Sequence, residues 1–288
     1  MFNETFSKLK TRIRSRADAI RISCELEATA PKLGNVHPAA SFADCSYDDF
    51  VAAAGKIAPV LGSPNADYQL GQRVLDAVAV TKFVTKANVN LGIILLIAPL
   101  AMIDSSDQIP SMLDSLTSDD GQNVFEAIRL ASPGGMKRKD VSADVDVESI
   151  AMGPIDLMAA MNHAASRDRI ALQYATGFTD FFQEVVGTVD DAMSRSIPAT
   201  VAVVDAQLRL MATSVDTLIA RKCGDDVAAE AMSRAAKCLQ HDSPSARNEF
   251  DAWLREDGNR RNPGTTADMI AASLYWLLRP SDAAPIRK

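Results

Sequence analysis

The sequence is poor in the residues that form cysteine- and histidine-based metal sites. Its 288 residues include only four cysteines and three histidines. These residues are scattered, and no two cysteines form a CxxC pair. Structural zinc sites need closely spaced Cys and His ligands, so this pattern disfavours one. The isolated cysteines are typical of reduced thiols, and we therefore expect a cytoplasmic protein.

The chain also lacks an excess of basic residues. It has 30 Lys and Arg against 37 Asp and Glu, a formal net charge of −7. Affinity for nucleic acids comes largely from basic residues that neutralise phosphates, so we expect no nucleic-acid partner. A local basic pocket for a small anion remains compatible with this charge.

Long hydrophobic runs are absent as well. The most apolar run, 89–103, is short for a membrane span and is interrupted by Asn90, Gly92 and Pro99. It predicts a buried helix. The N-terminus is charged and shows no apolar signal-peptide core. We therefore expect neither secretion nor a membrane partner.

The common nucleotide and hydrolase motifs are missing too. The sequence contains no GxxxxGK[ST] phosphate loop, no strand-linked GxGxxG, no HExxH and no GxSxG. Its 47% hydrophobic and 23% charged residues are ordinary globular values. The chain is therefore expected to fold on its own, but not into the common folds that these motifs mark.

Helical periodicity dominates the sequence and predicts an all-α fold. We expect one multi-helix domain over residues 1–288, with irregular loops that carry the site. A polar loop is predicted at Ser132–Glu148. Helices are predicted at 6–24, 46–61, 70–84, 89–103, 109–116, 124–131, 156–165, 167–182, 198–222, 227–239, 246–255 and 266–278.

Glu27 continues the apolar stripe of the first predicted helix. A carboxylate on a buried face is costly unless it is paired, bound to a metal or protonated. The alternative is that the helix has ended by this point and that Glu27 is solvated. The stripe itself consists of Phe6, Leu9, Ile13, Ala17, Ile20 and Cys24.

Polar clusters at predicted helix ends are the remaining candidates for a site. Carboxylates bind hard cations, while Lys, Arg and helix N-termini bind phosphate oxygens. Each cluster alone is equally compatible with helix capping. The clusters are Glu27 with Pro31–Val36, Asp44, Asn88–Gly92, Asp216–Thr217 with Arg221–Gly224, and Asn262–Asp268.

In this order and at these separations, the clusters resemble the triphosphoribosyl-dephospho-coenzyme A synthase family. The resemblance runs from about Cys24 to about Leu278. It implies a helical enzyme that breaks the adenine–ribose bond of ATP. The triphosphoribosyl group moves to a hydroxyl of dephospho-coenzyme A, and adenine is released.

The resemblance also implies roles for individual residues. Glu27 or Asp44 would be the general base or a metal-linked acid, and Asp216 and Asp268 would contact Mg²⁺ or the ribose. Lys32, Lys86, Arg221 and Lys222 are candidate phosphate contacts. The full set of predicted substrate-binding residues is Lys32, Gly34, Asn35, Asn88, Asn90, Thr217, Arg221 and Lys222.

Two departures from the family pattern bear on the substrates. Phe42 stands where typical members carry a histidine, and Asn88–Gly92 replaces an Asn-Thr-His-Lys-Gly segment, which puts Leu91 in the place of the lysine. Neither side chain can donate a proton or hold a phosphate. The variant pattern is similar to a branch found in archaea and in bacteria with methanopterin-linked one-carbon metabolism, which suggests a pterin precursor as acceptor.

Three other interpretations stay open from the sequence alone. The donor can instead be phosphoribosyl pyrophosphate, with pyrophosphate released. The chain can be a nucleotide-binding protein without turnover. It can also be a helical scaffold whose polar clusters are only caps and loops. Dimerisation through a helix face is also left open.

Overall fold

The structure is a computed structural model that describes residues 2–87, 89–131, 154–241 and 243–280. Over these ranges helices are the only regular elements, and an isolated bridge pairs His37 with Ala40. The predicted all-α fold is confirmed. Asn88 and the predicted loop Ser132–Glu148 lie outside the described residues.

The chain forms fifteen α-helices and two short helical turns over the described ranges. The N-terminal half contains α1 (Phe6–Lys10), α2 (Arg16–Thr29), α3 (Tyr47–Leu61), α4 (Leu70–Val84), α5 (Leu91–Leu100), η1 (Ser106–Gln108), α6 (Ile109–Asp114) and α7 (Ser118–Ala131). The C-terminal half contains α8 (Leu157–Ala164), α9 (Arg169–Ala175), η2 (Phe181–Val185), α10 (Val186–Ser194), α11 (Ala199–Thr213), α12 (Thr217–Cys223), α13 (Asp225–Gln240), α14 (Pro244–Arg255) and α15 (Gly264–Leu278).

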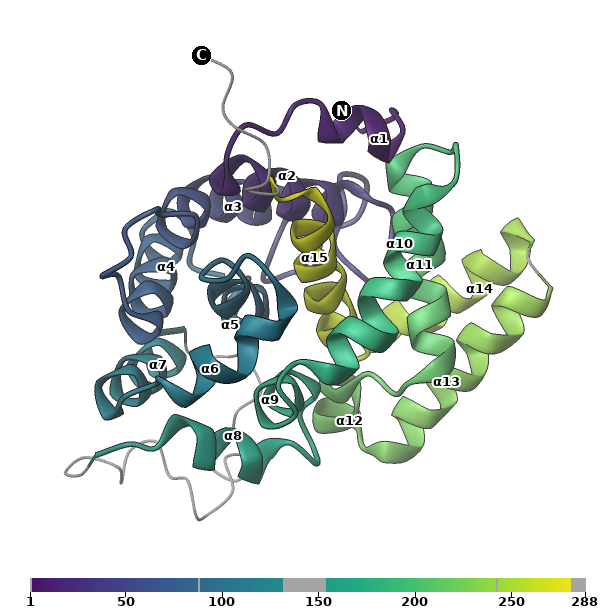
Figure 1. Cartoon of the computed structure of the whole chain (residues 1–288). Coiled ribbons are helices and arrows are strands. Elements are labelled where there is room, and N and C mark those ends of the chain that lie inside the picture. Colours follow the sequence, from purple (N-terminus) through teal and green to yellow (C-terminus); the bar gives the residue numbers. More distant parts are fainter. Residues whose placement is uncertain (1, 88, 132–153, 242, 281–288) are drawn as a thin grey trace.

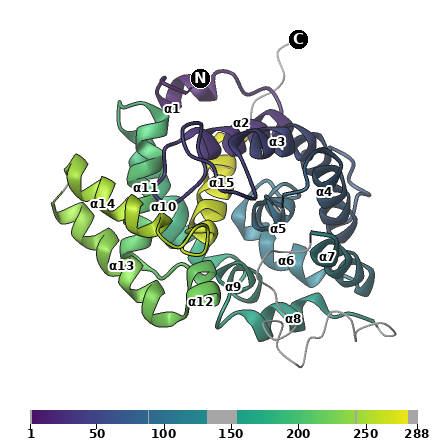
Figure 2. The same ribbon diagram turned by 180° about the vertical axis from the view of Figure 1, so that it is seen from behind.

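Helix α15 runs through the middle of the molecule (Figure 1). It packs against α2 and α5, and on its other side against α10 and α11. Helices α3, α4 and α7 lie outside α2 and α5, whereas α13 and α14 lie outside α11 (Figure 2). The N-terminal and C-terminal parts of the sequence therefore share one core.

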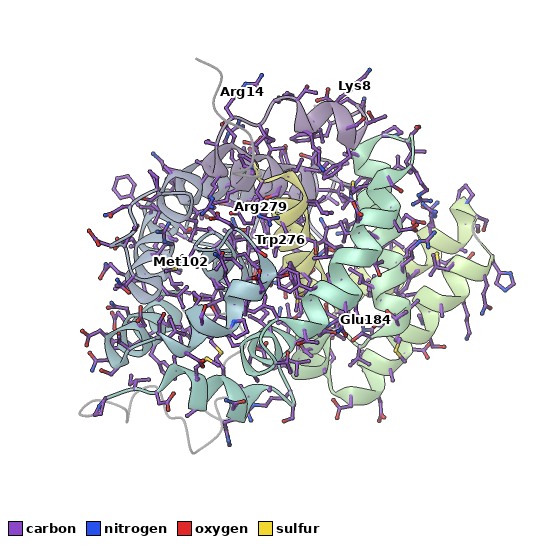
Figure 3. All side chains as sticks on the ribbon, viewed as in Figure 1. Lys8, Arg14, Met102, Glu184, Trp276 and Arg279 are labelled. Carbon is purple, nitrogen blue, oxygen red and sulfur yellow. The ribbon has the colours of Figure 1, made fainter. Side chains whose placement is uncertain are left out.

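The C-terminal end of α15 carries an aromatic cluster. The ring of Trp276 lies 4.9 Å from that of Phe182, and the guanidinium of Arg279 stacks over the Trp276 ring. Figure 3 shows Trp276 and Arg279 on the same face as Met102, which follows α5. These contacts fix the C-terminal end of α15, so its N-terminal end is held at a defined place among the other helices.

Most predicted helices are confirmed, but three are interrupted, two of them by side-chain caps and one by left-handed backbone angles. Ser15 accepts a hydrogen bond from Asp18 N and starts α2, so the first predicted helix is split into α1 and α2. Asp216 caps α12 in the same way and splits the predicted 198–222 helix. The predicted 167–182 helix ends early because Gly177 and Phe178 have left-handed backbone angles. The sequence prediction missed α10.

A proline inside α5 is compensated by a neighbouring helix. Pro99 has no N–H, so the carbonyl of Leu95 lacks its helical hydrogen-bond donor. The hydroxyl of Tyr174, in α9, donates to that carbonyl at 2.6 Å, and its side chain is fully buried. In the described part of the chain, neither α5 nor any other helix has the length and apolar character needed to cross a bilayer.

We predict that Tyr174→Phe lowers the free energy of unfolding by about 1–3 kcal/mol, because it leaves a buried carbonyl unpaired. Pro99→Ala restores an N–H in that place. In the double variant the loss from Tyr174→Phe is therefore expected to be smaller than in the wild-type background. Urea unfolding of the four proteins measures this coupling, and strictly additive free energies would contradict the compensation.

Candidate active site

A buried ion pair forms where α2 ends. Glu27 lies in the last turn of α2, and its Oε1 is 2.8 Å from Lys32 Nζ. The same ammonium donates to the backbone carbonyl of Glu27 at 2.6 Å. Both side chains are at most 5% exposed. A buried Glu27 was expected to need a partner, and the structure shows that this partner is Lys32. The alternative, a solvated Glu27, is wrong.

The loop after this pair is fixed by Gln207 of α11. The Gln207 side chain accepts from Leu33 N and donates to Leu33 O, both at 2.8 Å, and it donates to Asn35 Oδ1 at 2.9 Å. Asn35 in turn donates to Asn262 Oδ1 at 2.5 Å. Hydrogen bonds of this kind give a loop one conformation. They join the end of α2 to the segment that precedes α15.

Gly34 allows this loop to lie directly on α14. Its φ of +71° is a left-handed angle, and a Cβ added there would be 2.8 Å from Leu254 Cβ. Its N–H donates to Asp251 Oδ1 at 2.7 Å. The predicted substrate-binding residues Gly34 and Asn35 thus shape the loop, and their contact with a substrate stays a prediction.

The N-terminus of α5 meets the second turn of α15. Gly92 packs so closely on Asp268 that a Cβ added to Gly92 would overlap Asp268 Oδ2 and lie 2.7 Å from Ile170 Cδ1. Asn90 precedes α5 with a left-handed φ of 66°. Helices α5, α9 and α15 therefore converge on the Asp268 carboxylate.

Asp268 lies in an acidic surrounding. Burial of its carboxylate, followed by the charges of Glu27, Asp216 and Asp168, raises the pKa of Asp268 well above its ordinary value, and Arg221 partly offsets this. Part of the residue surface is still accessible. Asp268 is thus a carboxyl group with an increased tendency to hold a proton.

Asp216 accepts hydrogen bonds from the N-termini of two helices, α12 and α15. Its Oδ1 accepts from Leu218 N and Ile219 N and caps α12, while its Oδ2 accepts from the N–H and the hydroxyl of Thr266 in α15. Burial raises the pKa of Asp216, and these hydrogen bonds offset part of the rise. The metal contact predicted for Asp216 stays a prediction, but all four hydrogen bonds indicate a structural role.

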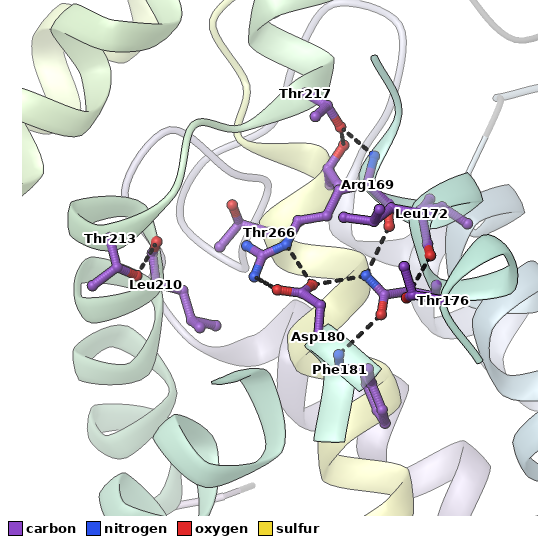
Figure 4. A network of polar contacts seen from close by, with 12 residues as sticks. Arg169, Leu172, Thr176, Asp180, Phe181, Leu210, Thr213, Thr217 and Thr266 are labelled. Atoms are coloured by element: carbon purple, nitrogen blue, oxygen red, sulfur yellow. Dashed lines mark hydrogen bonds and ion pairs between the residues drawn. The ribbon is translucent and has the colours of Figure 1, made fainter. Parts of the chain in front are cut away.

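A polar network ties α9 to the same place (Figure 4). The hydroxyl of Thr217 accepts from Arg169 N at 3.2 Å and bonds to the Thr265 hydroxyl at 3.1 Å. The Arg169 guanidinium forms two hydrogen bonds with Asp180, at 2.9 and 3.0 Å. The first turns of α9, α12 and α15 are therefore held side by side.

Cationic side chains gather at the outer edge of this site. Asn259 donates to both carboxylate oxygens of Asp44, at 3.0 and 2.8 Å, and Lys222 Nζ donates to the Asn259 carbonyl at 3.4 Å. Arg260 donates to the backbone carbonyl of Lys222 at 2.7 Å. Burial and the adjacent Arg221 lower the pKa of Lys222. We call Arg221, Lys222 and Arg260 the cationic rim.

The structure separates the predicted site residues into two groups. The inner group consists of Glu27, Lys32 and Asp268. The outer group consists of Asp44 and Lys222, and beside it Arg221 pairs with Asp168 at 3.3 Å. Lys86 is exposed. The guanidinium carbon of Arg255 lies over the Phe42 ring, 5.7 Å from the ring centroid.

Comparison with known proteins identifies the family. A family model described as CitG: ATP:dephospho-CoA triphosphoribosyl transferase matches residues 13–284. The chain belongs to the CitG family. It is also similar to a crystal structure of a protein from Archaeoglobus fulgidus, provisionally described as a triphosphoribosyl-dephospho-coA synthase. That match has a TM-score of 0.62 and 25% identity and covers 79% of this chain and 97% of the other. No curated protein matches.

The predicted family and the transferase class are thereby confirmed. The narrower resemblance to the methanopterin-linked branch stays a prediction. Sequence reasoning did not find Gln207, Asp168 or Asn259 as parts of the CitG-family site. Gln207 could have been noticed in the sequence, because it is a polar residue within the apolar stripe of the predicted 198–222 helix. No pattern marked the other two, because they approach the site only through loop geometry.

We predict that Gly92→Ala lowers the transferase rate by at least about 100-fold in a folded protein, because the new methyl group displaces Asp268 from its position. Gly55→Ala is the matched control. Gly55 lies in α3 with nothing within 4 Å of its added Cβ, so this change should stabilise the helix by about 0.5–1 kcal/mol without affecting the rate. Equal rates in both variants would contradict the role of the Gly92 contact.

We predict that Asp268→Asn stabilises the protein increasingly as the pH rises above about 4. In that range the unfolded chain releases the Asp268 proton while the folded chain retains it, so wild-type stability falls with rising pH until the raised pKa is passed. Asparagine cannot ionise and escapes this loss. Urea unfolding between about pH 4 and 8 measures the difference. A stability difference that does not change with pH would contradict the prediction.

Proposed function

We propose that the chain transfers the triphosphoribosyl group of ATP to a hydroxyl of dephospho-CoA and releases adenine, with Glu27 and Asp268 as the groups that move protons. The family match supports the two substrates. The placement of the chemistry rests on one packing observation: α15, which carries Asp268, packs against α2, which carries the buried Glu27–Lys32 pair, and Asp268 also contacts Gly92 at the N-terminus of α5.

The two carboxyl groups suit opposite roles in the reaction. Asp268, whose burial favours the protonated form, donates a proton to the adenine ring as the bond between ribose C1′ and adenine N9 breaks. The electron pair of that bond goes to N9. Glu27, which is paired with Lys32, stabilises the positive charge that develops on the ribose and accepts the proton of the attacking hydroxyl. The acceptor oxygen then forms the new bond to C1′.

The cationic rim is the part of the site that suits the triphosphate. Arg221, Lys222 and Arg260 bring three cationic groups to one edge, next to the first turn of α12. Arginine and lysine side chains form charge-assisted hydrogen bonds with phosphate oxygens. Thr217 and Asn35 belong to the supporting hydrogen-bond network, and we assign them a positioning role.

The described residues do not fit a preformed Mg²⁺ site. Both oxygens of Asp216 already accept two hydrogen bonds each. No group of three or more His, Cys, Asp or Glu side chains within the described ranges is arranged to hold a metal ion. The expected Mg²⁺ therefore enters this proposal only as the counter-ion that ATP carries, and no step depends on it.

A second acceptor is favoured by one local observation. Phe42 and Leu91 are neutral where typical family members carry a histidine and a lysine, and Phe42 is stacked under Arg255. These two positions can bind a flat or apolar group but not a phosphate. A hydroxyl on a pterin cofactor precursor is therefore the second candidate acceptor. The mass of the product formed with each acceptor distinguishes the two.

The test follows free adenine in mixtures of protein, ATP and dephospho-CoA. We expect adenine only when the acceptor is present, and we expect Glu27→Gln to lower its release by about 100- to 10,000-fold, the usual contribution of a general base. Glu25→Gln in the same helix is the matched control, because Glu25 pairs with Arg21 at 3.0 Å and not with Lys32. It should leave the rate nearly unchanged.

A loss of folding must be kept apart from a loss of chemistry. Glu27→Gln leaves Lys32 buried without a counter-ion, which costs about 3–5 kcal/mol. The double variant Glu27→Gln, Lys32→Met removes both charges and should recover most of that stability while staying inactive. A folded double variant that still releases adenine at the wild-type rate would refute the role of Glu27.

A further inference from the structure

Asn90 has a buried carboxamide that none of the described residues satisfies. The residue is 6% exposed, and neither its Oδ1 nor its Nδ2 has a hydrogen-bond partner among them. Buried polar atoms of native proteins are nearly always paired, because an unpaired one costs about 1–3 kcal/mol. The backbone adds to this cost, since φ of 66° is unfavourable for a residue with a side chain. Asn90 thus combines two unfavourable features in one place.

Asn90 directly precedes α5, at the end of this helix that lies against the Asp268 carboxylate. Gly92, two residues further on, contacts Asp268. The neighbours Val89 and Leu91 line a small apolar cavity of about 10 Å³ against α4, and Asn90 is not among its lining residues. Asn90 also does not cap α5 with its side chain. Its donor and acceptor are therefore free for a ligand at this helix end.

The charges around this helix end select the kind of ligand. The acidic groups Glu27, Asp216 and Asp168 act on Asp268 through their charges, and two of them are paired, Glu27 with Lys32 and Asp168 with Arg221. The two cations named here are already paired, so this end of α5 offers a triphosphate little positive charge. A neutral ring with N–H donors and nitrogen acceptors would be accepted. An asparagine side chain offers the complementary pair of one acceptor and two donors.

We propose that Asn90 binds the adenine ring of ATP through a two-point hydrogen bond and so selects a 6-aminopurine donor. Asn90 Oδ1 accepts from the exocyclic amine, and Nδ2 donates to a neighbouring ring nitrogen, which is the pairing that asparagine forms with adenine in DNA recognition. This inference rests on the proposed function, because it assigns one part of its donor substrate to one residue.

The assignment also orients the nucleotide. Adenine lies at the N-terminus of α5, next to Asp268, while the triphosphate points towards the cationic rim. The ribose then lies between them, near Glu27. In this orientation the leaving base is at the carboxyl group that donates a proton, and the phosphates avoid the acidic interior.

The experiment compares ATP with purine riboside 5′-triphosphate, which lacks only the 6-amino group. Calorimetric titration of the whole chain should show that the wild type binds ATP about 5- to 150-fold more tightly, the equivalent of one buried acceptor left unpaired. Asn90→Gly keeps the left-handed backbone and removes the carboxamide. It should bind the two nucleotides within about twofold of each other.

Asn90→Asp is the shape-matched second variant. It keeps the acceptor but loses the donor, so it should retain the preference for ATP while binding both nucleotides more weakly than the wild type. Inorganic triphosphate should bind equally to the wild type and to Asn90→Gly, because the cationic rim is unchanged. This control separates loss of the base contact from loss of the fold.

The outcomes distinguish this inference from the proposed reaction. If the wild type releases no adenine but prefers ATP, and Asn90→Gly loses the preference, the reaction is wrong and the adenine contact stands. If the wild type binds both nucleotides equally, or Asn90→Gly keeps the preference, the contact is overturned whatever the turnover shows. Wild-type affinity of Asn90→Asp for both nucleotides would overturn it as well.

Discussion

The buried ion pair between Glu27 and Lys32 is the interaction on which the site depends. Its ammonium group also binds the backbone carbonyl at the end of α2, so the chain leaves the helix in one direction only. The following loop reaches Gln207 and Asn262 because of that direction. Removing one partner of a buried pair is strongly destabilising. Loss of this ion pair is therefore expected to disturb both the end of α2 and the conformation of the loop that follows it.

A second constraint is the division of charge. The interior carries Glu27, Asp216 and Asp268, with Lys32 as the ion-pair partner of Glu27, while Arg221, Lys222 and Arg260 lie at the edge. Under the proposed function, this division would place the neutral end of a nucleotide inside and its anionic end at the edge. The raised pKa of Asp268 follows from this crowding and from burial. At neutral pH this raised pKa lowers the stability of the folded protein, because the unfolded chain releases the Asp268 proton more readily.

The sequence predicted the fold class and most helices, since apolar periodicity depends on local spacing. It also indicated that Glu27 needed a partner, because a carboxylate stood on an apolar stripe. It could not show that the partner is Lys32, because the turn after Pro31 brings the two side chains together. The breaks before α2 and α12 depend on Ser15 and Asp216 as caps, and both residue types occur as often in loops without capping. The approach of Gly92 to Asp268 depends on tertiary packing alone.

The packing of α15 against α2 and α5 has a consequence for the synthesis and the proteolysis of the protein. Glu27 and Asp268 are roughly 240 residues apart in the sequence, so their encounter is among the most non-local in the molecule and is expected late in folding. A ribosome-bound chain that has not yet released α15 keeps the inner face of α2 uncovered and has no complete site. Under the proposed function, the nascent protein would consume no ATP before α15 has packed, and a proteolytic cut that frees α15 would end activity.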